Sequence, residues 1–142
     1  MDDFLYACVQ LVHNVGAAAV VGSPAVAWWL GSTDQVTVAA AALVQRKLAW
    51  LTILAWSTQI ASGAGFGITT YYLKHELPDL TGVALAALGI KVACAILCVL
   101  LVLAYLRMAS RWSARMRLRV WQALFVLGLI ALMSAAFLRW YA

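Results

Sequence analysis

Charged side chains are scarce in this sequence: 11% of its 142 residues are Asp, Glu, Lys or Arg, whereas 66% are apolar or aromatic. The mean hydropathy is +0.94, and no ordinary water-soluble domain combines these values. The composition therefore excludes a soluble catalytic domain and indicates an integral membrane protein. At roughly 20 residues for each transmembrane helix, the length allows about four helices and leaves almost nothing for an aqueous domain.

Cysteine and the common catalytic motifs are also scarce or missing. The three cysteines, Cys8, Cys94 and Cys98, all lie in apolar stretches, which is not the disulfide framework of a small secreted domain. No GxSxG, HExxH, Walker or CxxCH motif occurs, so hydrolase, nucleotide-dependent and c-type cytochrome functions have no support. No positive charge precedes the apolar run that begins at Phe4, so we do not expect a cleaved signal peptide.

Four apolar stretches are long enough to cross a membrane, at about residues 4–30, 48–73, 80–106 and 120–138. We therefore expect an all-α integral membrane protein in which residues 1–142 form one antiparallel four-helix transmembrane bundle. Pro24 predicts a kink in the first helix, because its ring removes a backbone donor. The short apolar stretch 36–45 precedes two basic residues and is expected to lie along the membrane surface.

The basic residues predict the orientation of the bundle. The connections after the first and third spans hold seven of them, Arg46, Lys47, Arg107, Arg111, Arg115, Arg117 and Arg119, whereas the opposite side has Lys74 and Arg139. The positive-inside rule then places both termini outside the cytoplasm of a bacterial inner membrane. The net charge of +5 also indicates attraction to anionic lipid headgroups, and no nucleic-acid partner is expected because no aqueous binding domain is present.

Two basic side chains lie inside spans at similar depth. His13 is about 14 Å and Lys91 about 16 Å from the expected outer ends of their helices. A charged lysine at this depth costs at least about 2.5 to 3.5 kcal/mol, so it is expected to face the interior and meet a partner, or else to snorkel outward. No acid lies within any span, so that partner would be a bound anion, a lipid phosphate or another subunit.

His13 has two interpretations. It either makes an interhelical hydrogen bond to a group such as Gln59 or Ser62, or it ligates a metal, since imidazole is the common axial ligand of haem iron. We expect a polar pocket in the outer half of the bundle lined by His13, Asn14, Gln59, Ser62 and Lys91. His75, in the connection after the second span, is expected to be a solvated loop residue.

The remaining candidate site residues also have two interpretations each. Gly63 and Gly67 form a GxxxG step, which favours either helix packing or a flat cofactor surface. Met133 is either core packing or a second haem ligand with His13.

Cys94 and Cys98 share a helix stripe with Lys91. They are either small buried hydrophobes or thiolates that select copper(I).

Three short motifs carry a resemblance to a known family. They are Leu11-Val12-His13 in the first span, Arg46-Lys47 with Ser62-Gly63 further along the second, and Gly89-Ile90-Lys91 in the third. In these the chain resembles the copper-resistance D (CopD) membrane domain and the related small haem-dependent protoporphyrinogen oxidases of bacteria. The resemblance covers nearly the whole chain and implies functional roles for His13 and Lys91.

The sequence therefore favours a haem b-binding inner-membrane protein that acts in electron transfer or haem metabolism. Two alternatives stay open. One is a non-catalytic accessory or anchor subunit that works with membrane-protein partners or as a homo-oligomer, and the other is a copper-handling membrane protein.

Overall fold

Four long α-helices make up nearly all of the computed structural model, which describes residues 2–74 and 82–141. In chain order the elements are α1 (Asp2–Ser32), α2 (Val38–Lys74), α3 (Gly82–Met108), a short 3₁₀ turn η1 (Ala109–Arg111) and α4 (Ala114–Tyr141). Each α-helix contains a segment long and apolar enough to cross a membrane. The fold is therefore all-α, as expected, and its helices suit a multi-pass membrane protein.

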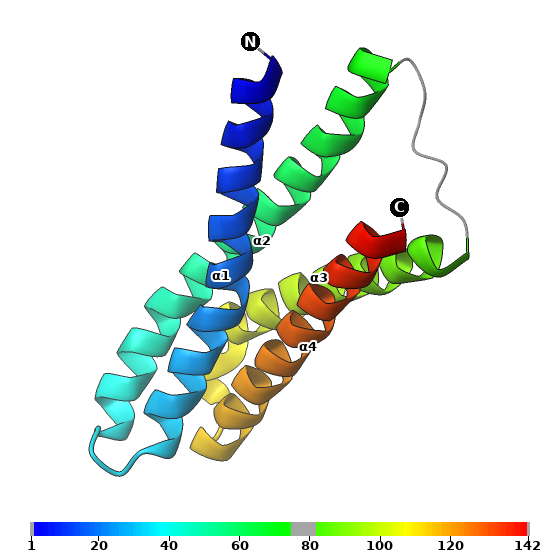
Figure 1. The fold of residues 1–142 in the computed structure, drawn as a ribbon. Coiled ribbons are helices and arrows are strands. Elements are labelled where there is room, and N and C mark those ends of the chain that lie inside the picture. The colour runs from blue at the N-terminus through cyan, green and yellow to red at the C-terminus, as the bar shows by residue number, and fades with distance from the viewer. Residues whose placement is uncertain (1, 75–81, 142) are drawn as a thin grey trace.

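The helices pack in two pairs, α1 with α2 and α3 with α4, and α1 also contacts α4. Figure 1 shows the α1–α2 connection and the beginning of α4 at one end of the molecule. The two pairs come together toward that end and diverge toward the end that holds the N-terminus (Figure 1). We call the first the basic end, for the charges described below, and the second the far end.

The second helix differs from its prediction. The stretch 36–45, expected to lie along the membrane surface, joins α2 without a break from Val38 onward. Ala41 and Gln45 are buried, because this part of α2 packs against α1 instead of lying free on a lipid surface. The prediction of a separate surface segment is therefore wrong. The helix continues through the alanine-rich run because alanine is the best helix former. The expected connection around His75 lies outside the described residues.

Polar side chains join α1 to α2 at three levels. Near the basic end, Gln45 Nε2 donates to the carbonyl of Ala27 over 2.9 Å. Further along, the hydroxyls of Ser23 and Thr52 meet at 2.8 Å in a buried contact. Toward the far end, Gln59 Nε2 donates to the carbonyl of His13. Side-chain hydrogen bonds hold membrane helices together, because lipid offers no competing partner.

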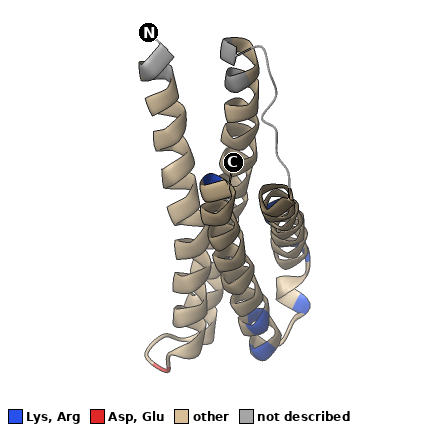
Figure 2. Cartoon of the chain, turned by 45° about the vertical axis from the view of Figure 1, so that its right-hand side comes forward, with Lys and Arg blue, Asp and Glu red and all other residues tan. Residues whose placement is uncertain are grey.

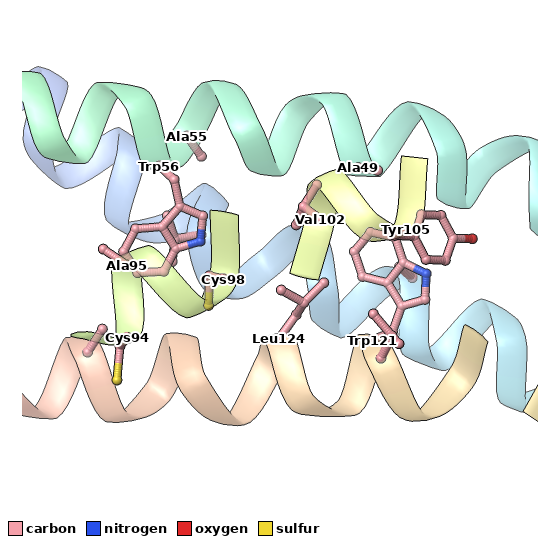
Figure 3. Close-up of a cluster of buried hydrophobic side chains, with 14 residues drawn as sticks. Ala49, Ala55, Trp56, Cys94, Ala95, Cys98, Val102, Tyr105, Trp121 and Leu124 are labelled. Atoms are coloured by element: carbon pink, nitrogen blue, oxygen red, sulfur yellow. The ribbon is translucent and has the colours of Figure 1, made fainter. Parts of the chain in front are cut away.

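The largest buried side chains lie between the two helix pairs, nearer the basic end. Figure 3 shows Trp121 and Leu124 of α4 packed with Val102 and Tyr105 of α3, and Trp56 of α2 beside Cys98. The Tyr105 and Trp121 rings meet edge to face with centroids 5.0 Å apart, a preferred aromatic geometry. Van der Waals packing of this kind is a main source of stability between helices in a membrane.

Pro24 lies inside α1, which continues unbroken on both sides of it. Because proline has no N–H, the carbonyl four residues earlier, that of Val20, loses its helical donor. Gly128 of α4 lies against this same carbonyl, so that a Cβ added there would come within 3.2 Å of the oxygen. Glycine at this position thus lets α4 approach α1 where the proline has left a carbonyl without its helical donor.

Charge is distributed unevenly along the bundle. Figure 2 shows Lys and Arg gathered around the end that holds the α1–α2 connection and the beginning of α4. Of the seven basic residues at this end, Arg46 and Lys47 lie within α2, and the other five lie between the end of α3 and the beginning of α4. One acid at this end, Asp34, is exposed. Asp34 stands in the connection between α1 and α2. The fold therefore presents a cationic rim at one end of an otherwise apolar bundle.

Candidate functional site

His13 lies near the far end of the α1–α2 interface and is half-buried. Its Nδ1 is 2.8 Å from the hydroxyl oxygen of Ser62 on α2. Its backbone carbonyl accepts the side-chain amide of Gln59, also on α2. Both groups that the sequence suggested as partners of this histidine are therefore in contact with it, one through the ring and one through the backbone.

The Ser62 hydroxyl oxygen lies 2.8 Å from His13 Nδ1 and 2.6 Å from the backbone carbonyl of Thr58. If the hydroxyl proton goes to the Thr58 carbonyl, Ser62 accepts from Nδ1–H and the lone pair of the neutral ring is on Nε2; if it goes to Nδ1, the ring has the opposite tautomer. Histidines that ligate metals use the first arrangement, in which one ring N–H donates to a protein group and the other nitrogen binds the ion.

Gly16 makes the contact between Gln59 and His13 possible. It lies one turn after His13 on α1 and is buried. A Cβ at this position would come within 2.8 Å of Gln59 Nε2, so any other residue would displace the glutamine amide. A glycine on α1 and a glutamine on α2 together fix the backbone that carries the histidine.

Aromatic and apolar groups surround the imidazole. Phe66 of α2 meets the His13 ring edge to face with centroids 5.5 Å apart, and it also packs against Tyr6. Next to Ser62 an open and mainly apolar recess of about 380 Å³ runs between α1 and α2, lined by Cys8, Val9, Val12, Thr58, Ala61, Ser62 and Gly65. Ser62, the partner of the His13 ring, lines this recess, whereas His13 itself does not.

Lys91 of α3 lies on the buried face of its helix. The buried residues of α3 recur at helical spacing, and Lys91 falls between Ala87 and Cys94 in that series. It is half-buried. No carboxylate occurs in the described part of α3, and none lies within the apolar stretches of the other helices. Among the residues whose side chains the structure describes, Lys91 therefore has no acidic partner within these apolar stretches.

Other predicted site residues lie elsewhere. Asn14 is exposed and accepts a hydrogen bond from Gln10 on its own helix, 2.9 Å away, so it points away from the site. Gly63 and Gly67 have open space where a Cβ would stand, so no helix packs on this GxxxG step within the described chain. Met133 is 62% exposed on α4, off the face that buries Gly128, Ala131 and Ser134.

Cys94 and Cys98 lie within the buried core with apolar neighbours (Figure 3). Among the described residues, no three His, Cys, Asp or Glu side chains come together in a group that could hold a metal ion. The two thiols therefore pack here as small hydrophobic groups.

Two features of this region were not expected from the sequence. Gly16 carried no signal, because a lone glycine in an apolar helix does not say which neighbour approaches it. Gln45 did carry one: it is the only polar residue of the stretch 36–45 other than Thr37. It was attributed to a surface segment, whereas it is buried and accepts the Tyr105 hydroxyl over 3.0 Å.

Comparison with known proteins adds no relative. No family model matches the chain, and no curated protein or solved structure is significantly similar to it.

Proposed function

We propose that this chain is a haem b-binding protein of a bacterial inner membrane and that it acts in electron transfer or haem metabolism. His13 would be the protein's axial ligand to the iron. When bound, haem supplies one-electron chemistry at the iron. The resemblance to the CopD domain and the small protoporphyrinogen oxidases is part of this proposal and rests on the motifs around His13, Ser62 and Lys91.

The observation that carries the proposal is the contact of His13 Nδ1 with the Ser62 hydroxyl, which also lies 2.6 Å from the Thr58 carbonyl. In the tautomer protonated on Nδ1, Ser62 accepts from His13 and donates to that carbonyl, and Nε2 keeps the lone pair that iron requires. The donor set fits haem better than a bare ion, because haem supplies four nitrogen ligands itself and needs only one or two from the protein. A bare ion would need a larger cluster of protein ligands.

Lys91 and Phe66 support the same proposal. A membrane-embedded lysine without an acidic partner favours an anionic ligand, and haem carries two propionates. The edge of the Phe66 ring against the imidazole restricts how the ring can turn. Lys91 would therefore hold a propionate while His13 holds the iron, each from a different helix pair.

The orientation in the membrane belongs to the proposal as well. An antiparallel arrangement with both termini outside the cytoplasm follows from the positive-inside rule. The His13 site would then lie in the periplasmic half of the bundle, and the basic end would face the cytoplasm. Partner subunits or a second copy of the chain would supply the electron donor or acceptor.

The test is the absorption spectrum of the purified protein after expression with ample haem. The wild-type chain is expected to show a Soret band with reducible α and β bands. His13→Ala is expected to abolish the Soret band while the protein still inserts in the membrane. Ser62→Ala is the sharper variant, because it keeps the imidazole but removes the acceptor of its Nδ1–H. It is expected to weaken haem affinity about tenfold or more.

Two variants serve as controls, His75→Ala and Met133→Leu. The first removes the other histidine of the chain and is expected to leave the spectrum unchanged. Met133→Leu tests whether the Met133 thioether is a second ligand of the haem iron. If it is, removing the thioether would shift the α band. A colourless wild-type protein, or full haem content in His13→Ala, contradicts the proposal.

Lys91→Met provides an independent test. It removes an uncompensated charge and keeps the length of the side chain, so the ligand-free bundle is expected to keep or gain thermal stability. Haem retention is expected to fall. Equal loss of stability with and without haem would show that Lys91 only packs the helices.

The alternative functions lead to different results in these experiments. An accessory subunit without a cofactor would be colourless and would co-purify with its partner. Copper handling is not carried further, because both core thiols are packed among apolar side chains.

A further inference from the structure

A second recess lies at the basic end, about as far from His13 as the bundle allows. It has a volume of about 320 Å³ and is lined by the end of α1, the α1–α2 connection and the beginnings of α2 and α4. This volume is at the small end of the range for small-molecule sites. The recess therefore has room for a compact polar group, at a level where the bundle meets a membrane surface.

Hydrogen-bond donors line this recess. Arg117 of α4 contributes a half-buried guanidinium, and Gln45 forms part of the wall. The hydroxyls of Thr33 and Thr37 each accept a backbone N–H, from Gln35 and Ala40. Each threonine hydroxyl therefore keeps its own proton available for another acceptor.

The charge of this end of the bundle also favours an anion. Arg117 is the basic residue and Asp34 the acidic residue that line the recess, and six further basic residues lie at the same end of the bundle. Arginine recognises phosphate oxygens through two parallel N–H···O bonds, in a way that lysine cannot. The arrangement suits one phosphate group better than a neutral or cationic ligand.

We propose that this recess binds the phosphate of an anionic phospholipid headgroup, with Arg117 as the principal contact. The lipid tails would continue along the apolar outer face of the bundle. A lipid is the source we favour because the recess stands at one end of helices that are long and apolar enough to cross a membrane. This site is independent of the haem proposal, since the two lie at opposite ends of the bundle.

The experiment is native mass spectrometry of the detergent-purified full chain with added dioleoylphosphatidylglycerol or dioleoylphosphatidylcholine. The wild-type protein is expected to retain the anionic lipid in preference to the zwitterionic one. Arg117→Gln is expected to reduce retention of phosphatidylglycerol about tenfold, as for one lost charge-assisted contact. Asp34→Asn is expected to increase it, because the opposing carboxylate is removed.

Arg115→Gln is the matched control, because it removes the same charge from an exposed position that does not line the recess. It is expected to change retention less than about twofold. Arg117→Lys keeps the charge without the paired donors and is expected to give an intermediate result; it also serves if Arg117→Gln does not fold.

Three outcomes overturn the proposal. Equal loss of phosphatidylglycerol retention in Arg115→Gln and Arg117→Gln would show that the lipid is attracted by the overall positive charge of this end and not by the recess. Equal retention of the two lipids would show that the phosphate charge is not recognised. Thermal protection by inorganic phosphate without retention of phosphatidylglycerol would identify a free anion as the ligand.

Discussion

The two ends of the α1–α2 interface are built alike. At each end a glutamine of α2 donates to a backbone carbonyl of α1, Gln45 to Ala27 and Gln59 to His13. The two contacts are about four helical turns apart on both helices. At each end a glycine of α1 makes room for the glutamine amide, because a Cβ there would come within 2.8 Å of its Nε2.

The two ends differ in the contacts that lie beside the glutamine. At the basic end, Oε1 of Gln45 accepts the hydroxyl of Tyr105 from α3, so the α1–α2 pair is tied to the α3–α4 pair. At the far end, Gln59 is followed by the His13–Ser62 contact within the α1–α2 pair, and the two pairs diverge (Figure 1). The same contact, a glutamine of α2 bound to a carbonyl of α1, thus helps to join the two helix pairs at the basic end and supports the backbone of the half-buried His13 at the far end.

The largest expected effect concerns the membrane sides of the two ends. A reporter enzyme active only in the periplasm is expected to be active when fused after Ala142 and silent when placed between Arg107 and Arg119. The reverse pattern would exchange the sides of the two ends and would place His13 toward the cytoplasm.

Removal of the large core ring at the basic end is expected to have the next largest effect. Trp121→Ala deletes a fully buried indole and is expected to lower the free energy of unfolding by about 3 kcal/mol. The measurement is thermal or denaturant unfolding in detergent micelles. Trp50→Ala is the control, because Trp50 is 60% exposed on α2, and it is expected to cost less than about 1 kcal/mol. Similar losses in both would mean that the core does not lie where Figure 3 shows it.

Substitutions of glycine test whether the two glutamine contacts are equivalent. Gly16→Ala and Gly31→Ala each force a glutamine amide to withdraw and are expected to cost about 1 kcal/mol, the size of one interhelical hydrogen bond. Gly22→Ala and Gly63→Ala meet no atom within 4 Å and are expected to be neutral or to stabilise by about 0.5 kcal/mol. The free energy of unfolding is measured in detergent micelles. If all four variants change it equally, the close contacts at Gly16 and Gly31 do not distinguish these glycines from Gly22 and Gly63.

The smallest expected effect separates closing the bundle from supporting the histidine. Tyr105→Phe removes the hydroxyl that links the helix pairs and is expected to cost about 0.6 kcal/mol without altering the His13 site. Ser62→Ala is expected to leave stability within about 0.5 kcal/mol but to change the imidazole NMR signals, since Nδ1 loses its hydrogen-bond partner. If Tyr105→Phe changes those signals as well, the two ends are coupled.

The helices themselves were largely predictable from the sequence. A membrane-spanning segment must satisfy every backbone group internally and present apolar side chains to lipid, so hydropathy locates the ends of α1 and α3 to within two residues and the start of α4 to within six. The start of α2 was misplaced by about ten residues, because a short alanine-rich stretch has the same composition on a membrane surface as inside a bundle.

The candidate site was predictable in part. A histidine among apolar residues stands out by its chemistry, and so do the serine and glutamine on the next helix. Their pairing needed the relative rotation of α1 and α2, which composition does not contain. The GxxxG step shows the same limit. Gly63 and Gly67 follow the pattern, yet a Cβ added to either would meet no atom within 4 Å. Gly16 and Gly128 lack the pattern, yet each lies in close contact with the neighbouring helix.

The sequence by itself determined that this is an all-α chain with four helices suited to a membrane, that its positive charge gathers at one end, and that few of its side chains could bind a ligand. Those conclusions depend only on composition and on the order of residues along the chain. Hydrophobicity determines which segments form membrane-crossing helices, and the positions of the charged residues determine where their charge lies. Only the tertiary structure decided which glutamine meets which carbonyl and that the His13 ring lies against the Ser62 hydroxyl. These depend on the rotation and spacing of packed helices, and many rotations are compatible with the same apolar surface.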